Sequence, residues 1–312
     1  MPQVAIIGAG LIGRAWASIF ARAGWDVAVW DPVAGQRAAA LGLIGAQLRD
    51  MAENGLADDA EVAHVRVRVA SSLEDAAKIA DFVQECGPEL PDVKRAVFAA
   101  LDAAAPPDVV LASSTSAIVA SQFTEHLKGR ARCLVGHPVN PPHLVPVVEI
   151  CGAPWTSDAA KARAREVYAS IGQVPITVMK EIDGFILNRL QAALLTEAFR
   201  LVQEGYVTPQ DLDHTVADGL GLRWSFMGPF ETIELNAPEG IADYCRRYAP
   251  FFRRTVAMPP TAAVWGDANT QRVAEAWGPS PAAAIVAAKS GWRDRRLAAL
   301  IAHKKSQRGA KS

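Results

Sequence analysis

The 312-residue chain lacks an excess of charge of either sign, and it lacks any long apolar run. Lys and Arg together number 32 and Asp and Glu number 33, so the formal net charge is −1. This balance provides no field that would attract nucleic acid or an anionic membrane. A membrane-spanning helix needs about 18 successive apolar residues, and no run approaches that length. The chain begins MPQVAIIGAG, without the basic start of a signal peptide, so we expect a cytoplasmic protein.

Cysteine is also scarce. The four cysteines show neither a CxxC pair nor a spacing with histidine that is typical of a metal site. We therefore expect no metal and no disulfide framework, only small, reduced side chains in the interior of a cytosolic enzyme. These cysteines are Cys86, Cys133, Cys151 and Cys245.

The order of apolar runs indicates two domains. Half of the residues are hydrophobic, which excludes a disordered chain. Up to about residue 180, short apolar runs alternate with amphipathic stretches, and beyond it only helical patterns continue. The sequence predicts a Rossmann-like, doubly wound α/β domain with a parallel sheet over residues 1–181, and a smaller all-helical domain over residues 182–312. The expected strands span residues 4–7, 27–30, 65–69, 79–83, 109–112, 133–135, 145–150 and 174–178.

The strongest local signal is the glycine motif Gly8-Ala-Gly10-Leu-Ile-Gly13, which follows one predicted strand and opens a predicted helix. Gly8 permits a tight turn, Gly10 lets the backbone approach a pyrophosphate, and Gly13 lets helix and strand pack closely. The backbone N–H groups of Leu11 and Ile12 would then face the phosphates at the positive end of the helix. The motif predicts a dinucleotide site.

An acidic residue at the end of the next strand indicates which dinucleotide is bound. Asp31 follows Gly13 by 18 residues, close to the spacing of about 20 expected for the acid that binds the ribose hydroxyls. A carboxylate there repels a 2′-phosphate, and the three residues after Asp31 include no arginine. We therefore expect NAD rather than NADP.

Polar residues that follow later strands predict a catalytic site. Four hydroxyl residues, 113–116, come directly after the apolar run VVLA, and His137 follows CLVG. Ligands of such sheets bind beyond the carboxyl ends of the strands. Imidazole suits a base that takes a hydroxyl proton near neutral pH. Glu149 stands alone in an apolar strand and is the candidate partner of His137, the alternative being an exposed edge strand.

Taken together, these motifs resemble the L-3-hydroxyacyl-CoA dehydrogenase superfamily, and within it the lambda-crystallin/L-gulonate 3-dehydrogenase branch. The resemblance covers nearly the whole chain. It rests on segments that occur in the family's order: GAGLIGRAWA, QECGPE, SSTSA, HPVNPP, GFILNRLQ, EAFRLVQEG, DGLGLRWSFMGPFET and LNAPEG.

The resemblance implies an NAD-dependent oxidoreductase with a His137–Glu149 dyad and with Ser116 and Asn188 at the substrate. It also implies a homodimer formed through the helical domain. Three further residues are implied at the cofactor, and they are Glu89, Lys94 and Asn140. The related β-hydroxyacid dehydrogenases instead place a catalytic lysine four residues before the asparagine, where this chain has Gly184.

The turn over residues 221–229 indicates which class of substrate is bound. Thioester-using members of the family have a short turn where this chain has the longer Gly-Leu-Arg-Trp-Ser-Phe-Met-Gly-Pro, with Arg223 in it. A guanidinium binds a carboxylate bidentately, which suits a free small hydroxy acid, although Arg223 could also be a surface residue. L-gulonate is the favoured substrate. The alternatives are L-carnitine, a 3-hydroxyacyl-CoA and, without any enzymatic role, a crystallin-like structural protein.

Overall fold

A computed structural model describes residues 1–256, 259–276, 278 and 282–308. The chain forms two compact units, which are considered separately below. The first unit comprises Met1–Leu187 with the described part of Lys289–Ser312, and the second comprises Asn188–Ala288. The structure therefore groups most of its last helix with the first unit, whereas the sequence predicts one helical domain over residues 182–312.

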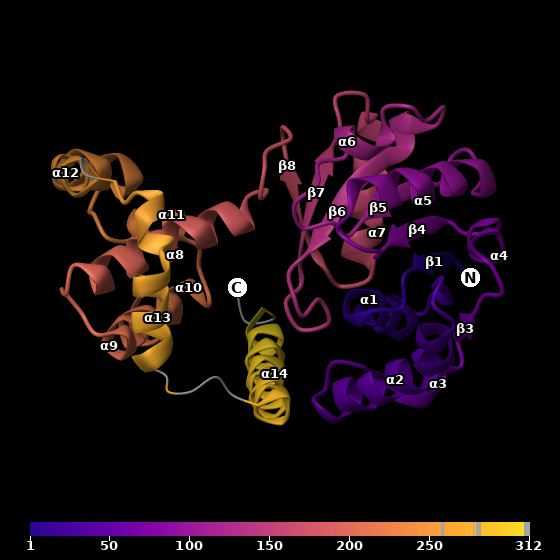
Figure 1. Cartoon of the computed structure of the whole chain (residues 1–312), viewed down its shortest axis with the longest axis horizontal. Helices are drawn as coiled ribbons and strands as arrows, with labels where there is room; N and C mark the ends of the chain where they lie inside the picture. The colour runs from indigo at the N-terminus through magenta and orange to yellow at the C-terminus, as the bar shows by residue number, and fades with distance from the viewer. Residues whose placement is uncertain (257–258, 277, 279–281, 309–312) are drawn as a thin grey trace. The chain divides into compact units, whose positions relative to one another are not determined.

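The first unit is built on an eight-stranded sheet of order β3-β2-β1-β4-β5-β6-β7-β8 (Figure 1). Neighbouring strands are parallel except for β6 and β7, which are antiparallel. This arrangement confirms the predicted Rossmann-like class. The strands are β1 (Gln3–Ile7), β2 (Asp26–Trp30), β3 (Val67–Val69), β4 (Phe82–Glu85), β5 (Val110–Ser113), β6 (Cys133–Pro138), β7 (Val147–Gly152) and β8 (Val174–Val178).

Four predicted strands begin one to three residues later than the sequence indicates, and two of these follow a short helix. The expected strand 65–69 is confined to β3, because Val65 is an exposed residue at the end of α3 (Ala60–His64). The expected strand 79–83 lies instead at β4, because Ile79 is exposed after α4 (Leu73–Ala77). In both cases an exposed apolar residue just after a short helix was counted as the start of the strand.

Helices cover both faces of the sheet because alternate strand residues point to opposite sides. In β1, Val4 and Ile6 pack in one core, and Ala5 and Ile7 pack in the other. The first core includes side chains of α1 (Leu11–Arg22), α2 (Ala34–Glu53) and α7 (Asp158–Ser170). The second includes side chains of α4, α5 (Pro91–Ala104) and α6 (Ser121–Thr124).

The last helix, α14 (Ala283–Arg308), joins the first unit through a small apolar cluster. Ala298 of α14 is buried together with Met51 of α2, Leu56 and Leu144. The sequence could not indicate this packing, because α14 lies far along the chain from each of these partners.

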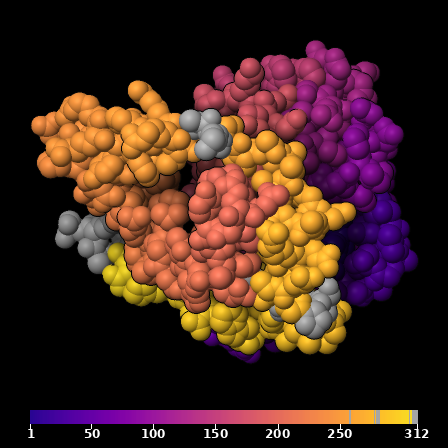
Figure 2. Space-filling view, turned by 60° about the vertical axis from the view of Figure 1, so that its left-hand side comes forward, coloured from indigo at the N-terminus to yellow at the C-terminus, as the bar shows by residue number. Residues whose placement is uncertain are grey.

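The second unit is helical, and its described residues include no strand. Fewer of its side chains are buried than in the first unit, and many of its large apolar side chains are exposed; much of its surface is in view in Figure 2. Its elements are α8 (Leu187–Gln203), α9 (Pro209–His214), a π-helical turn (Thr215–Leu220), α10 (Gly221–Trp224), α11 (Pro229–Glu234), α12 (Gly240–Thr255), a 3-10 turn (Ala262–Trp265) and α13 (Asp267–Ala276).

Candidate active site

The glycine turn has the geometry that its motif predicts. Gly8 directly follows β1 and has a φ of +111°, and a Cβ there would lie 2.6 Å from the carbonyl oxygen of Cys86. A Cβ at Gly13 would overlap the carbonyl oxygen of Gly8, so helix α1 can pack this closely only without a side chain. Gly10 faces open space, since a Cβ there would meet nothing within 4 Å beyond its chain neighbours. The turn thus leaves room for a pyrophosphate at the N-terminus of α1.

Asp31 lies at the carboxyl end of β2, beside this turn. It is 8% exposed, and its two carboxylate oxygens accept hydrogen bonds of 2.8 Å from the N–H groups of Ala9 and Val33. The carboxylate therefore ties the glycine turn to the strand end at which a ribose is expected. Arg37, which the sequence analysis did not single out, donates from its Nη1 to the carbonyl oxygen of Asp31 at 2.5 Å. It brings a cation close to this strand end.

His137 and Glu149 are brought together by strand register. They are directly opposite each other on the antiparallel strands β6 and β7, and the His137 Nδ1 to Glu149 Oε2 distance is 2.8 Å. Both are buried. Burial alone would raise the pKa of the Glu149 carboxyl, but hydrogen bonds from His137 and from the N–H groups of Leu187 and Ile186 hold that pKa below its usual value. Glu149 is therefore ionised at neutral pH.

The second oxygen of Glu149 holds the start of helix α8. Its Oε1 accepts hydrogen bonds of 2.9 Å from the N–H groups of both Ile186 and Leu187. The chain turns beforehand through left-handed conformations at Gly184, with a φ of +74°, and Phe185, with a φ of +48°. The Phe185 ring lies 5.4 Å from the His137 ring. One carboxylate thus fixes both the imidazole and the backbone that leads into Asn188.

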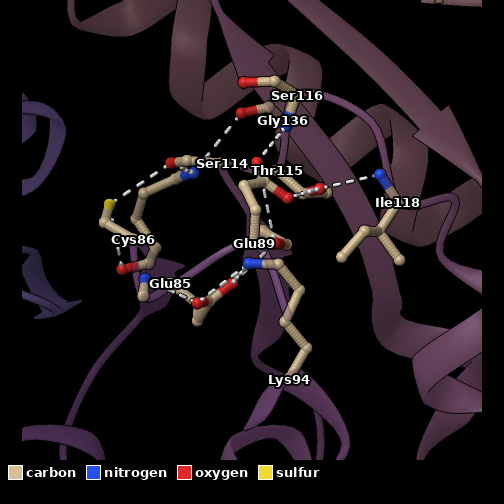
Figure 3. Close-up of polar contacts among 12 residues, drawn as sticks. Glu85, Cys86, Glu89, Lys94, Ser114, Thr115, Ser116, Ile118 and Gly136 are labelled. Carbon is tan, nitrogen blue, oxygen red and sulfur yellow. Dashed lines mark hydrogen bonds and ion pairs between the residues drawn. The ribbon is translucent and has the colours of Figure 1, made fainter. Parts of the chain in front are cut away.

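Ser116 lies in the turn after β5, and Glu89 holds that turn (Figure 3). Glu89 Oε1 accepts the N–H of Ser116 at 2.5 Å, and its Oε2 accepts the hydroxyl of Thr115 at 2.7 Å. The carboxylate expected at the cofactor is therefore bonded directly to the turn that carries a predicted substrate residue.

Lys94 lies inside the protein. Its side chain is 1% exposed, and its Nζ lies 3.2 and 3.0 Å from the two carboxylate oxygens of Glu85, which is also 1% exposed (Figure 3). The family resemblance implies that Lys94 lies at the cofactor, and the sequence did not lead us to Glu85. The available signal was a charged residue at the end of a buried strand, where it requires a partner.

Asn140 is exposed in the loop after β6. It lines a cleft of about 670 Å³ in the first unit together with Leu11 and Arg14 of α1 and with residues of α2 and α14. The structure therefore brings one implied cofactor residue and the glycine-turn helix to the same cleft.

Asn188 and Arg223 belong to the second unit. Asn188 is the second residue of α8, and Arg223 is an exposed residue of α10, which directly follows the π-helical turn. Their roles at the substrate stay predictions.

The remaining expectations concern metals, cysteines and membranes. Among the described residues, no group of three or more His, Cys, Asp or Glu side chains could hold a metal ion, and no helix is long and apolar enough to cross a membrane. The four cysteines are free. Cys133 and Cys151 are buried as expected, whereas Cys245 is exposed on α12.

Comparison with known proteins identifies the family. The family model of the 3-hydroxyacyl-CoA dehydrogenase NAD binding domain matches residues 3–182, and that of the C-terminal domain matches residues 184–274. The chain belongs to the 3-hydroxyacyl-CoA dehydrogenase family. It is an NAD-dependent oxidoreductase, and the open glycine turn beside Asp31 fits this cofactor.

Several relatives cover nearly the whole chain. The lambda-crystallin of Oryctolagus cuniculus is 40% identical over 306 residues, with 96% of each chain covered. The L-carnitine dehydrogenase of Pseudomonas aeruginosa is 37% identical over 298 residues, covering 95% of this chain and 92% of that protein. The crystal structure of FHMPC 5-dehydrogenase, an NAD+ dependent dismutase, has a TM-score of 0.84 at 26% identity, with 98% of this chain and 99% of that chain covered.

Proposed function

We propose that this protein oxidises the C3 hydroxyl group of a small free hydroxy acid with NAD, and that L-gulonate is its substrate. The observation that carries the proposed reaction is the buried contact of 2.8 Å between His137 and the ionised Glu149. This pair gives a base and its orienting partner at the carboxyl edge of a nucleotide-binding sheet, where a hydroxyl proton has to be removed.

In the proposed reaction, His137 takes the proton of the substrate and Glu149 orients and stabilises His137. The bond between Glu149 and Nδ1 assigns the ring proton to that nitrogen and leaves Nε2 to take the proton of the substrate hydroxyl. Glu149 then offsets the charge of the imidazolium. Ser116 and Asn188 hydrogen-bond the reacting oxygen and fix its geometry. NAD, when bound, accepts the hydride from C3, the carbon that carries this hydroxyl group.

The preference for a free acid rests on Arg223. Its guanidinium is exposed on α10, and the segment around it includes the longer turn noted in the sequence. A bidentate contact with a carboxylate suits L-gulonate, whereas a thioester has no anionic group at that position. The lambda-crystallin relative, at 40% identity, supports the assignment to the gulonate branch.

L-carnitine is the second candidate. A quaternary ammonium binds over aromatic faces, and α12 presents one such group. The rings of Tyr244 and Tyr248 lie 4.6 Å apart, and Tyr248 and Phe252 are each more than 40% exposed. Because some relatives are named L-carnitine dehydrogenase, any test of the substrate has to include L-carnitine.

The testing experiment is a substrate screen that follows NADH formation with L-gulonate, L-carnitine, 3-hydroxybutyrate and a 3-hydroxyacyl-CoA. We expect the highest kcat/KM with L-gulonate and at least about 10²-fold slower turnover by the His137→Ala variant. Faster oxidation of L-carnitine would transfer the assignment to the second candidate. No turnover of any of the four would favour the crystallin-like role. The intact dyad argues against that role, because a bulk structural protein would not need it.

We also propose a homodimer formed through the second unit. The apolar side chains of Leu190, Leu194 and Leu195 on α8 are exposed, Leu190 by 66%. Exposed apolar surface of this kind is often covered by a partner. Light scattering of the wild-type protein and of Leu190→Glu tests this proposal, since the variant should shift the mass from two chains to one.

A further inference from the structure

Glu85, at the end of β4, collects polar partners from three different segments. Its Oε1 accepts the N–H of Gly87 at 2.6 Å, and its Oε2 accepts the hydroxyl of Ser113, at the end of β5, at 2.5 Å. Lys94 of α5 neutralises the carboxylate with its buried ammonium group. A charge this deeply buried is tolerated only with full pairing, so these segments are held in one arrangement.

The partners of Glu85 lead to Ser116 by two routes (Figure 3). In the first, the Ser113 hydroxyl accepts the N–H of Thr115 at 3.2 Å. In the second, the chain continues from Gly87 to Glu89, whose carboxylate accepts the Thr115 hydroxyl and the Ser116 N–H. The contacts therefore close a ring that joins the end of β4, the loop before α5 and the turn after β5.

We propose that Glu85 is a positioning residue for Ser116, acting through Ser113 and through Glu89. The proposal rests on the proposed function only in that Ser116 is taken to contact the substrate. Removing the charge of Glu85 leaves the Lys94 ammonium without its partner. It also weakens the hydrogen bonds of Glu85 with Ser113 and Gly87, from which the two routes to Ser116 start. Ser116 would then keep its hydroxyl but lose its fixed place beside the reacting oxygen.

The structure offers a matched control in Asp102. Like Glu85, it is a shielded carboxylate that pairs with a cation, Arg132, at 2.9 Å and accepts the N–H of a loop glycine, Gly129, at 3.1 Å. Its contacts do not lead to the turn after β5. Glu85→Gln and Asp102→Asn therefore each remove a charge from a largely shielded ion pair, although Asp102 is 13% exposed and Glu85 only 1%, and only the first should affect Ser116.

The experiment measures both variants in the full-length protein and in a Ser116→Ala background. At saturating NAD, we expect Glu85→Gln to lower kcat/KM for the hydroxy acid by about 10- to 100-fold, the scale of a misplaced positioning group. In the Ser116→Ala background the same substitution should cost almost nothing further. Asp102→Asn should lower the thermal midpoint and leave kcat/KM unchanged. The double variant Glu85→Gln/Lys94→Met removes the unpaired ammonium and serves if Glu85→Gln does not fold.

Hydrogen exchange provides a readout that does not depend on turnover. The amides of Thr115 and Ser116 should exchange faster in Glu85→Gln than in the wild type, and they should be unchanged in Asp102→Asn. This readout remains decisive if the wild type oxidises none of the hydroxy acids, in which case the proposed function fails separately. Unchanged exchange at both amides, or effects of Glu85→Gln and Ser116→Ala on kcat/KM that simply multiply, would overturn the proposal.

Discussion

Glu149 and His137 face each other across an antiparallel strand pair, and the carboxylate that holds the imidazole at 2.8 Å also accepts the N–H groups at the start of α8. Glu149 therefore orients the imidazole of His137 and anchors the backbone next to Asn188 at the same time. The dyad thus connects the sheet to the first turn of the following helix through Glu149. Substitutions of His137 and of Glu149 should therefore have different consequences.

Replacement of His137 by Ala should affect chemistry alone. We expect turnover to fall by at least about 10²-fold, the usual scale for loss of a general base. The dissociation constant for NADH, followed by fluorescence, should stay close to that of the wild type, because we propose that the glycine turn and Asp31 bind the cofactor. Near-normal turnover by a variant that binds NADH normally would remove His137 from the mechanism.

Replacement of Glu149 by Gln should affect both chemistry and stability. The pKa of this carboxyl is lowered in the folded protein, so the ionised group stabilises the fold above the ordinary carboxyl pKa of about 4.3. This contribution is lost as the pH falls through the lowered, folded-state pKa. Thermal midpoints measured from neutral to acidic pH should therefore converge for the wild type and Glu149→Gln at the acidic end. Parallel curves would show that Glu149 contributes no pH-dependent stability.

Replacement of Arg223 by Met tests the carboxylate contact. A charge-assisted, bidentate contact contributes about 1.5–3 kcal/mol, which corresponds to a loss of roughly 10- to 150-fold in kcat/KM for the acid substrate. Arg223→Lys should recover only part of this loss, because lysine keeps the charge without the planar fork. The control is the neutral amide of the substrate. Equal losses with the acid and the amide would mean that Arg223 supports the fold rather than the substrate.

The cofactor preference should depend on Asp31. We expect kcat/KM to be at least about tenfold higher with NAD than with NADP, because a carboxylate near a 2′-phosphate costs several kcal/mol. Asp31→Ser should narrow this difference, and Arg37→Met in the Asp31→Ser background should widen it again by removing the nearby cation. Equal use of both cofactors by the wild type would contradict the assignment.

Local patterns were sufficient to predict the sheet, the glycine turn and the His137–Glu149 pair, because the glycines and His137 follow apolar runs and Glu149 interrupts one. The sequence suggested that His137 and Glu149 pair, because both are polar residues in apolar surroundings. It did not show that the register of β6 and β7 places them opposite each other. The Glu85–Lys94 pair was missed, since a lysine in an exposed-looking helix carries no sign that it turns inward. The packing of Ala298 against Met51 and Leu56 depends on tertiary structure alone, because no local period records which distant surface a helix will cover.

The position of α14 changes how the chain should be cut. The chain leaves the first unit at Leu187 and returns to it at Lys289, so the helical unit is an insertion in the connectivity of the nucleotide-binding unit. An N-terminal fragment that ends near residue 187 would expose Met51, Leu56 and Leu144 to water, with the loss of buried apolar area that this entails. A self-sufficient nucleotide-binding fragment would instead keep α14 from Lys289 onward and join it to the sheet by a short linker in place of residues 188–288.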